Sequence, residues 1–509
     1  MSSIDAAHAE SEPLLRERPE RTDQIAPTGE VTDDDDDRTT AQRLRLLFPC
    51  LLLLLCIMIG NGMTDTPLNE ISEAIICRNI FGQVSDPASD PRCKDSQVQS
   101  ELALISGWEL TFGLIPSLVV GVPFGLAADK YGRRAVILLT SVGVVLSTLL
   151  TIVICRYPET FSLRLRWLAP ILMLIGGGML TLSAMSYTVI ADISTKAYRS
   201  TAFLWMATTV TACSLVASPL TYFMMNEMGA WFTLIFGFAL MTLAIPIAAF
   251  VPETRPAAVV RRAETACKVA ETNSRIDNHS PRWISRSYVR STWQHLSLIN
   301  RTLFAGNPTV GLLISSTIFI TVGKSVVIML LQYVAKRFEW SWSKAGLLIG
   351  VKQATSLTLT ALALPALSQF LLRIGMAPLV KDWWIVRVSA VISVVGSLAM
   401  GLAQTVQLFI GAMMFAECGI GLQAALRGLV TELIDETHIA LVMTVLSLFM
   451  TISEMVAGPL MAQMFKVGMD WGGVWVGMPY LASAAMLSVG AVLVMIPPIV
   501  RHVATSPAV

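Results

Sequence analysis

Twelve apolar runs dominate this sequence, and each is long enough to cross a lipid bilayer. A transmembrane helix needs about 20 predominantly apolar residues. Because the chain is 54% hydrophobic and only 14% charged, against about 25% charge in soluble proteins, we expect an all-α membrane protein with twelve transmembrane helices. The runs lie near residues 44–64, 102–128, 134–155, 167–191, 200–224 and 230–251, and near 309–335, 345–367, 384–404, 407–433, 440–465 and 474–498.

Polar segments divide the chain into two sets of six runs. The segment before the first run contains an unbroken acidic stretch, residues 33–37, whose charges repel one another and predict disorder. The segment between the two sets contains many arginines, which place this segment in the cytosol by the positive-inside rule. Both termini are then cytosolic. The predicted parts are a disordered cytosolic tail over 1–43, a six-helix bundle over 44–251, a cytosolic loop over 252–308, a six-helix bundle over 309–498 and a cytosolic tail over 499–509.

The two sets of runs are related by an offset of 240 positions, which pairs Pro219 with Pro459 and Trp231 with Trp471. Proline and tryptophan are rare residues, so the shared offset favours an internal duplication. Transporters often consist of repeated halves around a central site. A proline inside a membrane helix marks a bend, and we expect bends at Pro219, Gly458 and Pro459.

Composition excludes several other classes of protein. The net charge of +1 gives no reason to expect a nucleic-acid partner. The sequence has no phosphate-binding loop and no HExxH or CxxC motif, and none of its five histidines lies in an apolar run. We therefore expect no enzyme activity, no metal site and no cofactor.

The connection between the second and third runs carries a motif over residues 125–134, Gly-Leu-Ala-Ala-Asp-Lys-Tyr-Gly-Arg-Arg. Gly125 allows helices to approach closely, and Gly132 permits a positive φ. Asp129 can accept hydrogen bonds from helix-end N–H groups and balance the arginines. The motif resembles the cytosolic signature of the major facilitator superfamily, Gly-x-Leu-x-Asp-Arg/Lys-x-Gly-Arg-Arg, at Gly125, Asp129, Lys130, Gly132, Arg133 and Arg134.

This resemblance spans roughly residues 44–500 and implies the major facilitator fold, with twelve helices in two six-helix pseudo-repeats. It also implies a monomeric secondary transporter that works by alternating access, in which the motif latches the two halves in one state. The chain looks most similar to uncharacterised filamentous-fungal members, whose first external loop holds two cysteines and a Gln-Ser-Glu segment. Here these are Cys77, Cys93 and residues 99–101. Such members often accompany secondary-metabolite pathways.

Two details of the sequence bear on proton coupling. Ser214-x-x-x-Ser218-Pro219 is similar to the Gly-x-x-x-Gly-Pro motif of antiporters, which favours exchange against protons. Leu172 stands where many proton-coupled members have an arginine, which puts the usual proton-linked pair in doubt.

Cys77 and Cys93 share an external loop in an oxidising compartment. A disulfide between them and two free thiols are both open possibilities.

Five ionisable residues lie inside predicted spans, where a charge costs free energy and needs a partner or water. In the family, helices seven, eight, ten and eleven border the central cavity. The charges are either structural ion pairs or groups that bind substrate or protons. Lys324 is expected to pair with Glu417 or Glu454, or to bind an anionic substrate. The candidate substrate-binding and proton-binding residues are Lys324, Glu417, Glu454, Lys352 and Glu109.

A sorting signal bears on the membrane in which the protein resides. Glu10, Leu14 and Leu15 resemble an acidic dileucine signal, which would direct the protein to a vacuole. The plasma membrane is the favoured location without it.

The sequence thus favours proton-linked efflux of a small organic compound or secondary metabolite. An uptake carrier for a nutrient or organic anion is one alternative, and a nutrient sensor of the same fold that no longer transports is another.

Overall fold

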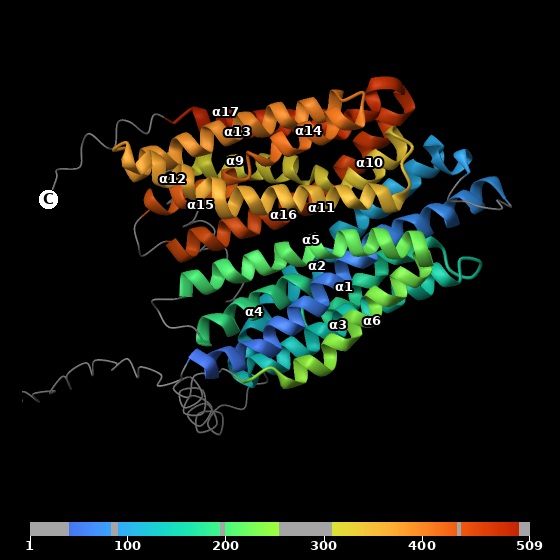
Figure 1. Cartoon of the computed structure of the whole chain (residues 1–509), viewed down its shortest axis with the longest axis horizontal. Coiled ribbons are helices and arrows are strands. Elements are labelled where there is room, and N and C mark those ends of the chain that lie inside the picture. Colours follow the sequence, from blue (N-terminus) through green and yellow to red (C-terminus); the bar gives the residue numbers. More distant parts are fainter. Residues whose placement is uncertain (1–39, 83–89, 194–198, 254–307, 435–438, 498–509) are drawn as a thin grey trace, which may run out of the picture. The chain divides into compact units, whose positions relative to one another are not determined.

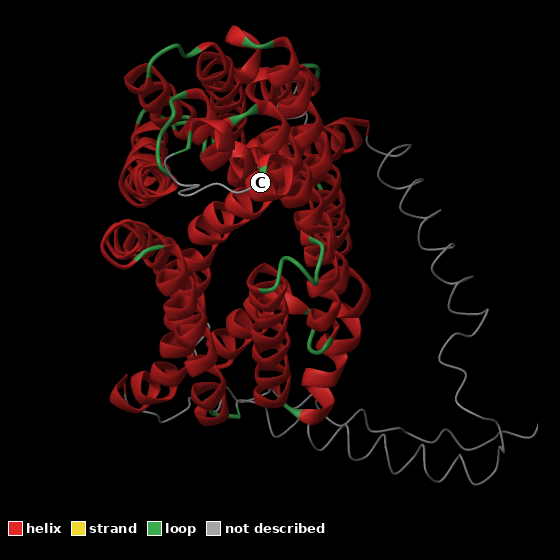
Figure 2. Cartoon of the chain, turned by 90° about the vertical axis from the view of Figure 1, so that its right-hand side faces the viewer, coloured by secondary structure: helices red, strands yellow, loops and turns green. Residues whose placement is uncertain are grey.

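Helices are the regular elements of the computed structural model, and Figure 2 shows helices and loops but no strand in the residues that it describes. Those residues are 40–82, 90–193, 199–253, 308–434 and 439–497. The chain divides into a short unit, Met1–Leu44, and a main unit, Arg45–Val509, and the account below concerns the main unit. Our expectations for residues 1–39 of the first tail, for Glu10, Leu14 and Leu15, for most of the central loop and for the last tail lie outside the described residues. The end of the first tail is helical instead of disordered, because α1 begins at Thr40.

The first half contains six spans, coloured blue to green in Figure 1. The first helix continues well beyond the predicted run, because polar residues near its end interrupt the apolar pattern without ending the helix. The spans are α1 (Thr40–Phe81), α2 (Ser96–Tyr131, preceded by the short η1, Pro91–Lys94), α3 (Arg133–Arg156), η2 (Leu163–Leu174) with α4 (Gly178–Ile193), α5 (Arg199–Met228) and α6 (Ala230–Phe250).

The second half also contains six spans, coloured yellow to red, and several of them are broken into consecutive pieces (Figure 1). They are α9 (Pro308–Lys324) with η4 (Ser325–Met329) and α10 (Leu330–Arg337); α11 (Trp342–Thr358) with the π-helical η5 (Leu359–Ala363) and α12 (Leu364–Arg373); α13 (Pro378–Leu402); α14 (Val406–Glu417) with α15 (Gly421–Glu432); α16 (Ile439–Trp471); and η7 (Gly473–Gly477) with α17 (Met478–Met495).

Every predicted run therefore coincides with one helix or with two or three consecutive helical pieces. Among the described residues, 11 spans are long and apolar enough to cross a membrane. The remaining span is α5, which is 30 residues long and whose first side chains lie outside the described residues. The expected twelve-helix fold is confirmed.

The two halves touch along two seams, α2 with α16 and α5 with α11. At the first seam the backbones are in contact, since a Cβ built on Gly107 would lie 2.7 Å from the carbonyl oxygen of Gly458. At the second seam Ser218 Oγ donates to the Gly346 carbonyl at 2.7 Å and accepts from the Gly350 amide at 3.0 Å. The duplication relates these seams, because Ser218 precedes Pro219 in α5 and Gly458 precedes Pro459 in α16.

The seams lie toward one end of the bundle, and the helices separate toward the other. We call these the disulfide end, where Cys77 and Cys93 are bonded, and the motif end, where residues 125–134 lie. Toward the motif end, Val122 and Leu126 of α2 are each 67% exposed, as is Leu362 of η5. The halves are thus in contact at the disulfide end, whereas these side chains of α2 and η5 are uncovered at the motif end.

The fourth span is broken because the backbone of its middle must pass very close to α3. Gly176 has a φ of 116°, in the left-handed region that glycine tolerates. A Cβ there would lie 2.4 Å from the amide nitrogen of Thr140. The break leaves η2 as a separate segment that carries Arg166 into the bundle.

Candidate functional site

A cavity of about 650 Å³ lies between the halves, and we call it the central cavity. Its walls come from α1, α2, α3, η2, α4 and α6 of the first half and from η4, α10 and α11 of the second. Apolar side chains such as Leu110, Leu114 and Ile152 supply much of the surface. The polar and charged lining includes Asn61, Asp65, Ser106, Glu109, Arg166, Gln332, Lys352 and Gln353.

A buried arginine organises the charges on the first-half wall of the central cavity. Arg166 is 2% exposed, and one of its Nη atoms lies 2.5 Å from a carboxylate oxygen of Glu109. Its other Nη atom donates to Ser72 Oγ at 2.8 Å. Asp65 is exposed to the cavity and interacts electrostatically with Glu109 and Arg166. The guanidinium thus pairs with Glu109 and has a second carboxylate, Asp65, in its vicinity.

The second half contains a smaller cavity of about 250 Å³, which we call the lysine chamber. Lys352 Nζ lies 3.1 Å from Glu417 Oε1 on its wall. Lys324 Nζ donates instead to the Gly419 carbonyl at 3.2 Å. In this conformation Lys324 forms no ion pair with Glu417 or Glu454, because Lys352 engages Glu417, although Glu417 still interacts electrostatically with Lys324.

Breaks in two helices position the chamber's charged groups. Lys324 is the last residue of α9, where the backbone tightens into the 3₁₀ segment η4. Glu417 is the last residue of α14, before a turn that leads into α15. Discontinuous membrane helices often form the binding sites of transporters. Glu454 is half-buried on α16 and lines neither cavity.

The motif end is held by ion pairs and a helix cap. Arg133 forms an ion pair with Asp192 at the end of α4. The carboxylate of Glu253 accepts hydrogen bonds from the backbone amides of Arg133 at 3.1 Å and Arg134 at 3.4 Å. A negative group at a helix N-terminus complements the helix dipole. Glu253 thus caps α3, a role we had expected of Asp129, whose side chain lies outside what the structure describes.

The motif glycines differ in their surroundings. Gly132 adopts a φ of 102°, as expected from the turn between α2 and α3. A Cβ on Gly125 would meet nothing within 4 Å, so the close helix approach expected there is absent. The reason is that this part of α2 is exposed. Lys130 is also exposed, and its Nζ lies 5.2 Å from the ring centroid of Tyr131.

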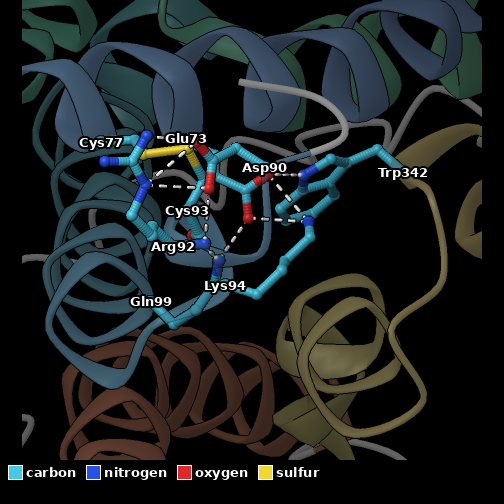
Figure 3. The surroundings of a disulfide bond; sticks show 8 residues. All are labelled: Glu73, Cys77, Asp90, Arg92, Cys93, Lys94, Gln99 and Trp342. Atoms are coloured by element: carbon cyan, nitrogen blue, oxygen red, sulfur yellow. Dashed lines mark hydrogen bonds and ion pairs between the residues drawn. A yellow bond between two sulfur atoms is a disulfide. The ribbon is translucent and has the colours of Figure 1, made fainter. Parts of the chain in front are cut away.

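The disulfide end is closed around a buried carboxylate, Glu73, which is 1% exposed (Figure 3). Cys77 and Cys93 form a disulfide that ties the end of α1 to η1, one turn from Glu73. Both oxygens of Glu73 lie 2.8 Å from Lys94 Nζ. Gln99 also donates to this carboxylate and, at 3.1 Å, to the Cys93 carbonyl.

The same carboxylate joins the two halves. Trp342 of α11 donates from its indole Nε1 to Glu73 at 2.7 Å, and Lys94 Nζ lies 5.0 Å from the Trp342 ring centroid. Lys336 of α10 donates to the Lys94 carbonyl. Outside this cluster, the Arg92 guanidinium hydrogen-bonds Asp90 and holds the pKa of that carboxyl below its usual range. We call Glu73, Lys94, Gln99 and Trp342 the gate cluster.

Three residues central to these arrangements escaped sequence reasoning. Asp65 and Glu73 lie in the part of α1 beyond the predicted run, and Arg166 lies just before the predicted fourth span. The signal for the longer helix is that Asp65, Asn69 and Glu73 follow one another at intervals of four residues, which places them on one face of a helix. Among the described residues, no group of three or more His, Cys, Asp or Glu side chains could hold a metal ion.

Comparisons with known proteins agree with this arrangement. The sequence profile of the Major Facilitator Superfamily matches residues 96–380. The chain is 32% identical to the efflux pump ustT of Aspergillus flavus over 423 residues, which are 82% of this chain and 81% of that protein. It is 26% identical to the MFS efflux pump atnC of Emericella nidulans, over 87% of this chain and 86% of that one. The crystal structure of a D-xylose–proton symporter shares the fold, with a TM-score of 0.57, 16% identity and coverage of 88% and 96%.

Proposed function

Because the chain belongs to the Major Facilitator Superfamily, we propose that it is a monomeric secondary transporter that exports a small organic metabolite in exchange for protons. The observation that carries this proposal is the central cavity, which both halves line and which holds Asp65, Glu109 and Arg166. The names of the relatives as efflux pumps support the direction. Export to the outside places the protein in the plasma membrane, and a vacuolar membrane is the alternative.

The packing of the halves supports transport by alternating access. Disulfides form in oxidising compartments, so the disulfide end faces outward and the motif end faces the cytosol. The gate cluster and both seams then close the outer side, while the exposed faces of α2 and η5 border the inner opening. The structure corresponds to the state that loads substrate from the cytosol. In the opposite state the motif at residues 125–134 latches the halves.

Protons are exchanged at the Asp65, Glu109 and Arg166 cluster. A guanidinium close to a carboxyl group favours the ionised form of that carboxyl. One carboxyl therefore takes up a proton when the cavity opens outward and releases it when Arg166 is its neighbour in the inward state. Arg166 thus provides an arginine inside the membrane, although Leu172 occupies the position at which many proton-coupled members of the family have one.

Replacing Glu109 with glutamine should uncouple transport from protons. The change removes a charge-assisted hydrogen bond to Arg166 that is worth about 1.5–3 kcal/mol, so transport driven by a pH gradient should fall roughly tenfold or more. Asp65→Asn should act in the same direction. The measurement is dequenching of a pH-sensitive dye in everted vesicles. Glu101→Gln is the matched control, because Glu101 forms an exposed pair with Arg164 between the same two elements.

The transported compound can be found by comparing metabolites inside and outside cells that express the protein or lack it. A compound retained in the deficient cells and released by the expressing cells would then be tested in everted vesicles. Depletion of a compound from the medium by expressing cells would instead favour an uptake carrier. Growth signalling without flux of any compound would favour a nutrient sensor.

A further inference from the structure

The lysine chamber carries an excess of positive charge. Lys324 and Lys352 contribute two ammonium groups, and Glu417 contributes one carboxylate, which Lys352 engages at 3.1 Å. Within the described part of the chain, Lys324 forms no ion pair and has only the neutral Gly419 carbonyl as acceptor. A lysine at this depth in a membrane is costly without a counter-charge or water. The chamber therefore lacks one negative charge.

Two buried hydroxyl groups of the same chamber also lack partners in the described structure. Tyr480 is 0% exposed and Ser393 is 4% exposed, both line the chamber, and neither hydroxyl has a hydrogen-bond partner. Ser393 Oγ adjoins Gly419, since a Cβ built on that glycine would lie 2.2 Å from it. The hydroxyl thus lies beside the carbonyl that holds Lys324. A buried hydroxyl without an acceptor costs free energy, and an oxygen-rich ligand would supply one.

The chamber adjoins the central cavity, because the two spaces share lining residues. Val327 and Lys352 line both spaces. The chamber's volume of about 250 Å³ admits a small group, whereas the central cavity has room for a larger and mostly apolar body. A ligand can therefore place a charged head in the chamber and its remainder between the halves.

We propose that the lysine chamber binds the carboxylate of an amphipathic monocarboxylic acid, with Lys324, Tyr480 and Ser393 as donors to its oxygens. A monoanion balances the single excess charge, whereas a phosphate dianion would exceed it. The role of this site in transport rests on the proposed export function. If that function holds, the exported compounds are organic acids.

Equilibrium binding of radiolabelled benzoate to the purified full-length protein tests the site without requiring transport. Benzoate should bind saturably, and its uncharged analogue benzamide and inorganic phosphate should not compete. Lys324→Met should weaken benzoate binding roughly tenfold or more, because a charge-assisted hydrogen bond is lost. Tyr480→Phe keeps the packing and should weaken binding by a smaller factor. Lys381→Met is the matched control, since Lys381 pairs with Asp382 outside the chamber.

Absence of saturable benzoate binding, equal competition by benzamide, or unchanged affinity in both Lys324→Met and Tyr480→Phe would overturn the site. The two proposals fail separately. If benzoate binds through Lys324 but no acid crosses the membrane, the chamber stands and export does not. If cells export an uncharged metabolite and benzoate does not bind, export stands and the chamber does not.

Discussion

Alanine at position 107 is expected to reduce transport at least tenfold while the protein still reaches the membrane. Alanine is normally the better helix former, by about 1 kcal/mol over glycine. Here its Cβ would lie 2.7 Å from the Gly458 carbonyl oxygen and 2.9 Å from the Ala462 Cβ. Relief of such overpacking costs about 1–3 kcal/mol, and in this structure it requires α2 and α16 to move apart. The state closed at the disulfide end would then be depleted.

Flux in vesicles and protein amount by blotting measure this effect together. Gly458→Ala should reproduce it, because the contact is mutual. Gly411→Ala is the control, since a Cβ at this position in α14 would meet nothing within 4 Å. Wild-type flux in Gly107→Ala would show that the backbone contact between the halves is not needed for transport.

Glu73→Ala is expected to destabilise the folded protein and to unlock its outer side. The change removes the acceptor of Lys94, Gln99 and Trp342. Breaking a buried ion pair by deleting one partner costs about 3–5 kcal/mol. Trp342→Phe removes one hydrogen bond from the gate cluster and should cost about 1 kcal/mol.

Denaturation of the purified variants measures their stability. Labelling of a cysteine introduced by Ser106→Cys measures whether the gate cluster keeps the outer side closed. Ser106 lines the central cavity, so a membrane-impermeant maleimide should reach it from outside faster in Glu73→Ala than in the wild type. Glu101→Ala is the control, because its pair with Arg164 is exposed and such pairs contribute about 0–1 kcal/mol. Equal labelling of the wild type, Glu73→Ala and Glu101→Ala would show that Glu73 does not keep the outer side closed.

The sequence predicted the helices better than the contacts between them. Apolar runs locate a span because lipid demands about 20 such residues. They do not give the rotation of a helix about its axis, which decides whether Lys324 or Lys352 reaches Glu417. The motif was found from its spacing alone, but its cap came from Glu253, which is distant in sequence.

Polar residues at the ends of spans were the main source of error. The run that predicts the first span stops near residue 64, yet α1 continues to Phe81 because Glu73 is satisfied by partners from η1, α2 and α11. The predicted fourth span excludes Arg166 for the same reason. Hydropathy cannot distinguish a charge in solvent from a charge whose partners lie on other helices.

The position of the disulfide in the chain also gives the protein an order of assembly. Cys77 and Cys93 are separated by 16 residues and flank the connection between the first two spans. Synthesis proceeds from the N-terminus, and segments fold in that order. Both sulfurs thus reach the oxidising side while Trp342 has yet to be synthesised. The acceptor Glu73 and its partners Lys94 and Gln99 are therefore in place before the second half, which carries Trp342, can pack against them.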